Sequence, residues 1–194
     1  EYALEGLEAY LTPQSEAQNT SSIINIAGEV AGGKGMAMGL SLAYNSLNDT
    51  TGTYLKGNVI TLSEDADNSV KLAAANQGKA LAVAGGVDVN ISQSTFGAVG
   101  TVAINRGVSN TESIVDGKEN GEKTKLDKVK ELSVTAEELT KKTTVAGSVS
   151  VGGKKVGIGG AVAYTSVGTD GTREKLRAEI NNADITTTDA GTIE

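Results

Sequence analysis

The chain has 194 residues and a formal net charge of −7 at pH 7, with 25 Gly, one Pro, one Phe and no His, Cys or Trp. Aromatic residues make up 3% of the chain, too few for a core built on large rings, whereas 38% hydrophobic residues are too many for a disordered chain. Without His or Cys there is no Ser-His-Asp triad, thiolate nucleophile, disulfide or usual zinc site. We therefore expect no catalytic residue, no cofactor and no metal.

The net negative charge and the hydropathy of the chain also limit the kinds of partner that we expect. A net negative chain argues against nucleic acid and against anionic membrane surfaces, since both attract clustered Lys and Arg. No run of 18 apolar residues occurs, so we expect no membrane-spanning segment. The chain begins at Glu1 without a signal peptide, and we interpret it as a piece of a longer protein.

The clearest signal is internal similarity at a spacing of sixty residues. Segments 36–45, 96–105 and 156–165 share Gly and Ala at matching positions and place Tyr44, Ile104 and Tyr164 equivalently. Such self-similarity is typical of repeat architectures. We expect one repetitive segment over 1–194, made of units at about 24–79, 80–142 and 143–194, with 1–23 as the end of a preceding unit.

Within the units the hydrophobic pattern has a period of two, which predicts β-strands. Between 36 and 44, large Met, Leu and Tyr alternate with small Ala, Gly and Ser. The face that carries the small side chains must therefore stay flat or pack against another part of the protein. We expect Leu42 and Val102 to be buried and Tyr44 to be packed, because its equivalent is Ile104. Tyr54 has no aromatic equivalent and is expected to face outward.

A charged insertion interrupts the second unit near residues 116–128 and has no hydrophobic pattern. We interpret it as a protruding loop and as the natural place for contact with a partner. The candidate partner-binding residues are Asp116, Lys118, Glu119, Glu122, Lys123, Lys125 and Tyr54.

Short repeated strands between Gly- and Asn-rich turns predict an all-β fold, a parallel β-solenoid (β-helix) with repeats of about 60 residues. We expect each unit to form about three coils of roughly 20 residues. The alternative is an antiparallel β-sandwich or roll, in which Gly-rich segments at 32–35 and 152–155 close hairpins.

The run from Ile24 to Leu55, with its Gly/Ala-rich strand pair followed by Asn48-Asp-Thr-Thr-Gly52, resembles a unit of giant exoproteins from anaerobic Gram-negative bacteria. These are the leukotoxin-type and filamentous-haemagglutinin-like passengers, exported by two-partner or autotransporter secretion. The resemblance implies a secreted or bacterial cell-surface β-helix that continues into neighbouring repeats. It also implies a virulence role, as a toxin or adhesin contacting a host-cell surface protein or glycan.

From these observations we expect a non-enzymatic, structural and adhesive repeat segment that contributes to host-cell contact. One alternative is a directly cytotoxic leukocyte-binding module that uses the charged loop. Another is a carbohydrate-active β-helix, for which paired carboxylates are required. The carboxylates available for such a role are Glu64, Asp65, Asp67, Glu137 and Glu138.

Overall fold

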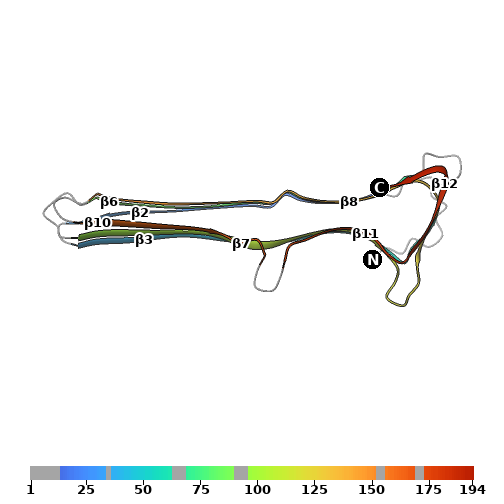
Figure 1. Ribbon diagram of the computed structural model, residues 1–194, viewed down its shortest axis with the longest axis horizontal. Coiled ribbons are helices and arrows are strands. Elements are labelled where there is room, and N and C mark those ends of the chain that lie inside the picture. Colours follow the sequence, from blue (N-terminus) through green and yellow to red (C-terminus); the bar gives the residue numbers. More distant parts are fainter. Residues whose placement is uncertain (1–13, 34–35, 63–68, 90–95, 152–155, 169–172) are drawn as a thin grey trace.

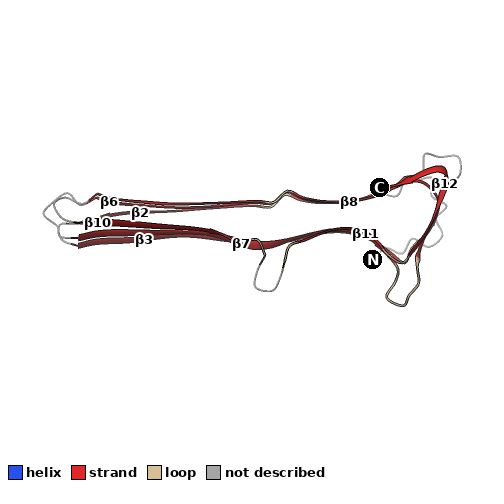
Figure 2. Ribbon diagram, viewed as in Figure 1, coloured by secondary structure: helices blue, strands red, loops and turns tan. Residues whose placement is uncertain are grey.

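The computed structural model describes residues 14–33, 36–62, 69–89, 96–151, 156–168 and 173–194. Over these residues the secondary structure is entirely β, as expected (Figure 2). The strands are β1 (Gln14–Asn19), β2 (Ser22–Gly32), β3 (Met36–Lys56), β4 (Val59–Thr61), β5 (Ser69–Asn76), β6 (Lys79–Val89), β7 (Phe96–Asp116), β8 (Thr124–Glu138), β9 (Lys141–Val151), β10 (Gly157–Thr165), β11 (Lys175–Ile180) and β12 (Ala183–Ile193). No described helix is long and apolar enough to cross a membrane.

The strands form three sheets in which every pair of named strands is parallel. The first sheet has the order β1-β5-β8-β12, with β4 also paired to β8; the second has β2-β6-β9; in the third, β7 pairs with β3 on one side and with β10 and then β11 on the other. The antiparallel alternative is therefore wrong for the described strands, whose only antiparallel contact is an isolated bridge between Gly107 and Gly168. The segments expected to close hairpins lie largely outside the described residues.

Hydrogen-bonded partners are far apart in the sequence. Met36 pairs with Phe96 and Gly97 with Gly157, in both cases sixty residues further along. Consequently the chain returns to a neighbouring strand only after a whole unit. The expected coil length of about 20 residues is therefore wrong for the described sheets, in which paired residues lie about 60 positions apart.

The molecule is a long, thin structure of two layers (Figure 1). The β3-β7-β10/β11 sheet forms one layer along the whole length, and the other two sheets lie end to end in the opposite layer. At the end of the molecule where β2, β6 and β10 are labelled, the β2-β6-β9 sheet faces the β3-β7-β10 half of the long sheet. We call this part the thin half.

Small side chains fill the interior of the thin half. Ala43 and Ala103 of one layer meet Ala82 and Ala84 of the other, and all four are at most 1% exposed. The layers lie so close that a Cβ on Gly86 would come within 2.5 Å of the Val99 side chain. The buried positions of the thin half are occupied mainly by Ala, Ser, Thr and Asn, with Val99 as a larger exception, because interiors are close-packed.

The large apolar side chains of the thin half therefore point outward, and two expectations about burial are wrong. Leu42 is 57% exposed and Tyr44 is 46% exposed, while Val102 is half-buried. The physical reason is that a period-two pattern separates two faces without saying which one the opposite layer covers. Here the narrow gap selects the small face.

A conventional aliphatic core lies at the opposite end of the molecule. Leu126, Leu132 and Val115 are completely buried there, and Leu55, Ile60 and Ile185 pack against the same cluster. Burial of each such side chain contributes roughly 1.5–3 kcal/mol to folding. This end, rather than the thin half, carries most of the aliphatic burial.

Candidate interaction surface

The predicted loop exists but is shorter than expected. It runs from 117 to 123 between β7 and β8 and projects from the end of the molecule that carries the aliphatic core (Figure 1). Lys118 and Glu122 form an ion pair of 2.8 Å within it, and this ammonium holds the pKa of the Glu122 carboxyl below its usual range. Lys123 forms an ion pair of 2.7 Å with Asp184, and Glu119 is exposed.

The ends of the expected loop belong to strands. Lys125 lies in β8, opposite Val59 and Asp184, and Asp116 is the last residue of β7. Thr124 is fully buried, and its hydroxyl accepts a hydrogen bond from the Gly57 backbone N–H and donates one to the Asp116 carbonyl. The boundary of 116–128 is therefore corrected to 117–123.

Tyr54 faces outward as predicted and lies next to the base of the loop. It is 47% exposed, and its strand register places it two positions before the Lys56–Asp116 pair. Its hydroxyl donates a hydrogen bond of 2.9 Å to Glu112, and the Lys56 ammonium lies 5.2 Å from its ring centroid. Partial burial, followed by the bond to Glu112, raises the pKa of the Tyr54 phenol.

The carboxylates considered for glycoside chemistry are not brought together in the described part of the chain. Glu64, Asp65 and Asp67 lie outside it. Glu138 accepts hydrogen bonds from Asn76, Thr111 and the backbone of Thr140, so it is committed to holding neighbouring strands. Within the described ranges no group of three or more acidic side chains is placed to hold a metal ion.

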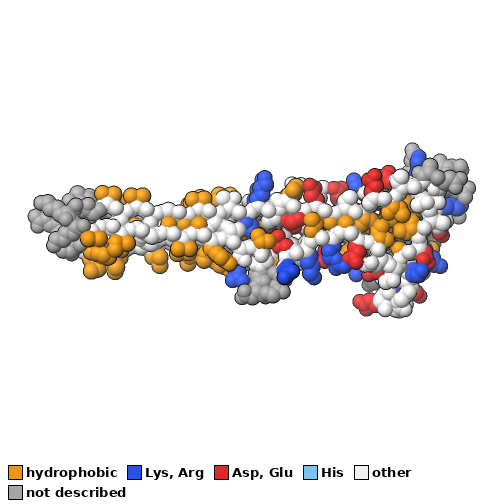
Figure 3. Space-filling view, in the orientation of Figure 1, with side chains coloured by type: hydrophobic (Ala, Val, Ile, Leu, Met, Phe, Trp, Pro, Cys, Tyr) orange, Lys and Arg blue, Asp and Glu red, His pale blue; other side chains and the backbone are white. Residues whose placement is uncertain are grey.

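A second surface, which the loop prediction did not include, covers the outside of the thin half (Figure 3). Hydrophobic side chains line both outer sides of this half, whereas Lys, Arg, Asp and Glu gather over the other half of the molecule. We call the following exposed residues the outer apolar faces: Ile24, Ile26, Val30, Val87, Val89, Val145, Val149 and Val151 on one layer, and Met36, Met38, Leu40, Leu42, Tyr44, Ile158, Val162 and Tyr164 on the other.

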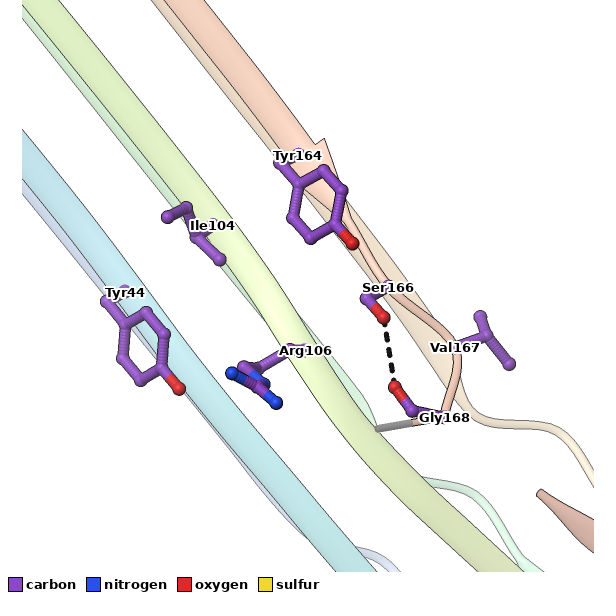
Figure 4. A pocket seen from close by; sticks show the side chains of 7 residues that line it. All are labelled: Tyr44, Ile104, Arg106, Tyr164, Ser166, Val167 and Gly168. Atoms are coloured by element: carbon purple, nitrogen blue, oxygen red, sulfur yellow. Dashed lines mark hydrogen bonds between the residues drawn. The ribbon is translucent and has the colours of Figure 1, made fainter. Parts of the chain in front are cut away.

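The outer apolar face of the long sheet ends at a pocket of about 420 Å³ that is open to solvent (Figure 4). Strand register aligns Tyr44 of β3, Ile104 of β7 and Tyr164 of β10 in one row. Neighbouring strands lie about 4.8 Å apart, so the two tyrosine positions are separated by about 10 Å. Figure 4 shows both rings face-on, with Ile104 between them.

A polar row follows directly after the tyrosine row. Arg106 is the next outward residue of β7, and register places Ser46 beside it on β3. On the other side the Ser166 backbone N–H donates to the carbonyl of Asn105, and its hydroxyl donates to the carbonyl of Gly168. The pocket therefore combines two aromatic rings, an aliphatic side chain, a guanidinium and the Ser166 hydroxyl, with Ser46 beside Arg106 on β3.

Arg106 is the charged group of this surface. Over the described outward positions of 36–48, 96–108 and 157–165, no other side chain is ionised at neutral pH. No described acidic residue forms an ion pair with it, whereas Arg177, Lys123 and Lys142 all have carboxylate partners. Its guanidinium donors are available to a ligand in the part of the chain that the structure describes.

Sequence reasoning missed Arg106 although a signal for it was present. The segment beginning at Arg106 departs from the other units, which carry Ser46 and Ser166 at the neighbouring places. A charged residue that replaces a small one in a repeat marks a position that the fold does not require. The pairing of strands was needed to show that this position falls one outward row beyond Ile104, which lies between two exposed tyrosines.

Comparison with protein-family models, with curated proteins and with solved structures finds no match for this chain. The likeness to leukotoxin-type and filamentous-haemagglutinin-like exoproteins therefore stays a prediction.

Proposed function

We propose that the chain is a segment of a parallel β-solenoid with a coil of about 60 residues, which serves as a non-enzymatic structural and adhesive repeat of a large secreted or surface-bound exoprotein. The solenoid is supported by the parallel pairing of β3 with β7 and of β7 with β10, each at an offset of sixty residues. In such a fold each coil packs only on its neighbours, so repeated coils extend the structure along the stacking axis, across the strands. An extended scaffold suits a stalk that holds a contact surface away from its own cell.

The observation that carries the adhesive role is the outward placement of large apolar side chains in the thin half. Met38, Leu40 and Leu42 are 68%, 72% and 57% exposed, although small residues occupy the interior positions between them. Contiguous exposed apolar surface is uncommon in a protein without partners and marks interaction sites. We therefore assign contact with a host-cell surface to the outer apolar faces.

The non-enzymatic part of the proposal is supported by the chemistry of the residues. The chain has no His or Cys, and Glu138, one of the candidate carboxylates, accepts hydrogen bonds from Asn76, Thr111 and the Thr140 backbone. A general acid or a nucleophile needs a free carboxyl group beside a substrate cleft.

The proposal is tested by binding of the fluorescently labelled chain to leukocytes and epithelial cells. Three substitutions, Met38→Thr, Leu40→Thr and Leu42→Thr, remove apolar area and keep β-propensity. The matched control shortens the loop by replacing 118–122 with two glycines, and circular dichroism checks that both variants are folded.

We expect saturable binding that the triple variant loses and the loop variant keeps. Binding lost only with the loop would move the contact to the charged loop, as in the cytotoxic-module alternative, and overturn the assignment to the apolar faces. Absence of saturable binding by the unmodified chain would overturn the adhesive role and leave a spacer.

A further inference from the structure

We propose that the pocket formed by Tyr44, Ile104, Arg106 and Tyr164 binds an unsulfated acidic glycan, in which one carboxylate-bearing sugar is flanked by neutral sugars. This inference deepens the adhesive function proposed above and rests on it. It names the ligand chemistry of one end of the outer apolar face.

The two tyrosines provide stacking platforms. Their exposed fractions, 46% for Tyr44 and 54% for Tyr164, leave much of each ring open to solvent, and Figure 4 shows both rings face-on. The face of an aromatic ring is electron-rich. The C–H groups on one side of a pyranose ring carry partial positive charge, so a sugar packs favourably on such a face while its hydroxyls stay hydrated at the edge.

The spacing of the rings selects an oligosaccharide over a single sugar. Tyr44 and Tyr164 occupy one row on strands that flank β7, which separates them by about 10 Å. A glycan that crosses the strands can place one sugar over each tyrosine and the intervening sugar over Ile104. The central sugar then lies next to Arg106, the following outward residue of β7.

The Arg106 guanidinium selects a negatively charged central sugar. Arg106 has no carboxylate partner among the described residues, and Arg recognises a carboxylate with two parallel hydrogen bonds. Ser46 and Ser166 stand on either side with hydroxyls for the sugar rim. A single guanidinium matches a single carboxylate.

Charge also excludes more highly charged polymers. The whole chain carries −7, and the described outward positions around the pocket offer one cation only. Single-stranded nucleic acid stacks on aromatic rings as well, but its binding sites follow the phosphates with a positively charged groove. A heavily sulfated glycan has the same requirement, so the pocket favours a glycan with one carboxylate among the sugars that it contacts.

The test is isothermal titration calorimetry on the full chain with a hexasaccharide of alternating glucuronate and N-acetylglucosamine. Its carboxyl methyl ester is the neutral comparator, and a heparin hexasaccharide is the sulfated one. The variants are Tyr44→Ala, Tyr164→Ala, Arg106→Gln and Arg106→Lys. Arg177→Gln is the control for loss of an exposed arginine, and Val59→Ala, a 63% exposed side chain of β4, is the control for loss of exposed apolar area.

We expect Arg106→Gln to weaken the acidic hexasaccharide by about tenfold or more, because a hydrogen bond to a charged group contributes about 1.5–3 kcal/mol. The same variant should bind the methyl ester as tightly as the unmodified chain does. The affinity of Arg106→Lys for the acidic hexasaccharide should lie between those of the unmodified chain and Arg106→Gln. Each Tyr→Ala change should weaken both ligands, and both controls should bind like the unmodified chain. Circular dichroism verifies that every variant is folded.

Several results would overturn the glycan proposal. These are equal binding of acid and ester, tighter binding of heparin, or the absence of heat from any oligosaccharide. The cell-binding assay separates this failure from that of the adhesive function. Retained cell binding by the Tyr44→Ala/Arg106→Gln/Tyr164→Ala variant would reject the glycan site alone, whereas no binding by the unmodified chain would reject adhesion itself.

Discussion

The side-chain amide of Asn45 donates a hydrogen bond of 2.9 Å to the side-chain oxygen of Asn105, sixty positions later in the chain, with both side chains buried between the two layers. Asn45 also donates to the Leu81 carbonyl, and Asn105 donates to Thr144 and to the Thr143 carbonyl in the opposite layer. These two residues join neighbouring strands of one sheet and also join the two sheets.

We predict that Asn105→Leu lowers the free energy of unfolding by about 2–3 kcal/mol, since it removes the buried hydrogen bonds that Asn105 forms with Asn45, Thr144 and the Thr143 carbonyl. Urea denaturation followed by circular dichroism measures the change. Thr50→Ala, at an exposed position of β3, is the control and should stay within about 0.5 kcal/mol. Equal effects of the two changes would show that the buried amides are not needed for stability.

Two substitutions in β3 test whether its small side chains face the interior and its large side chains face solvent. Ala43→Leu inserts a branched side chain where exposure is 0%, and we predict a loss of about 3 kcal/mol or more, because overpacking is strongly unfavourable in so narrow a gap. Leu42→Thr, one position away and 57% exposed, should change stability by about 0.5 kcal/mol at most. Thermal or urea unfolding of the two variants measures both losses of stability. A larger loss for Leu42→Thr than for Ala43→Leu would mean that the face with the large side chains is the buried one.

Gly107 is required by the backbone at the place where β10 leaves the sheet. Its φ is 157°, and a Cβ there would lie 1.7 Å from the carbonyl oxygen of Leu47. We predict that Gly107→Ala lowers the free energy of unfolding by at least about 2 kcal/mol, through the clash with the neighbouring strand. Gly85→Ala is the matched control, because nothing lies within 4 Å of its added Cβ. A change of equal size in both variants, measured by urea unfolding, would contradict this reason.

Shortening the loop and removing its strand-bound end should have different consequences. Replacing 118–122 with two glycines should leave the melting temperature nearly unchanged, since the ion pair that it removes is exposed. A longer deletion, 118–125, should lower it clearly, because it removes the buried Thr124 and its hydrogen bonds to Gly57 and Asp116. Differential scanning calorimetry compares the two deletions. Thr124→Ala alone should reproduce part of the loss, and a neutral result for Thr124→Ala would disprove the role assigned to its hydroxyl.

Ionisation of Tyr54 should occur at higher pH than that of an ordinary tyrosine. Partial burial, and next the hydrogen bond to Glu112, favour the neutral phenol and raise its pKa. A raised pKa contributes stability that is present below the pKa of the unfolded chain and is lost as pH rises through the folded value. Ultraviolet absorbance titration, with Tyr54→Phe subtracted, measures this ionisation. In Glu112→Gln the Tyr54 pKa should fall, and an unchanged value would contradict the role given to Glu112.

The sequence by itself determined the local structure and the equivalence of positions. Alternation at a period of two predicts strands because successive side chains of an extended chain point to opposite faces. The spacing of 36–45, 96–105 and 156–165 aligns the same residues that pair as neighbours in β3, β7 and β10. An all-β, parallel arrangement was therefore predictable, since it follows from short-range geometry and from similarity between segments.

The tertiary structure decided which face of each strand is buried, where the loop ends and which residues meet at the pocket. Leu42 and Ala43 alternate in either arrangement, and only the distance between layers puts the alanine inside. Lys125 belongs to a charged run, yet pairing with β4 and β12 draws it into β8. Arg106 lies between Ser46 and Ser166, and next to two exposed tyrosines, solely because strands sixty residues apart are hydrogen-bonded. Packing distance and strand register are long-range properties, which no local pattern contains.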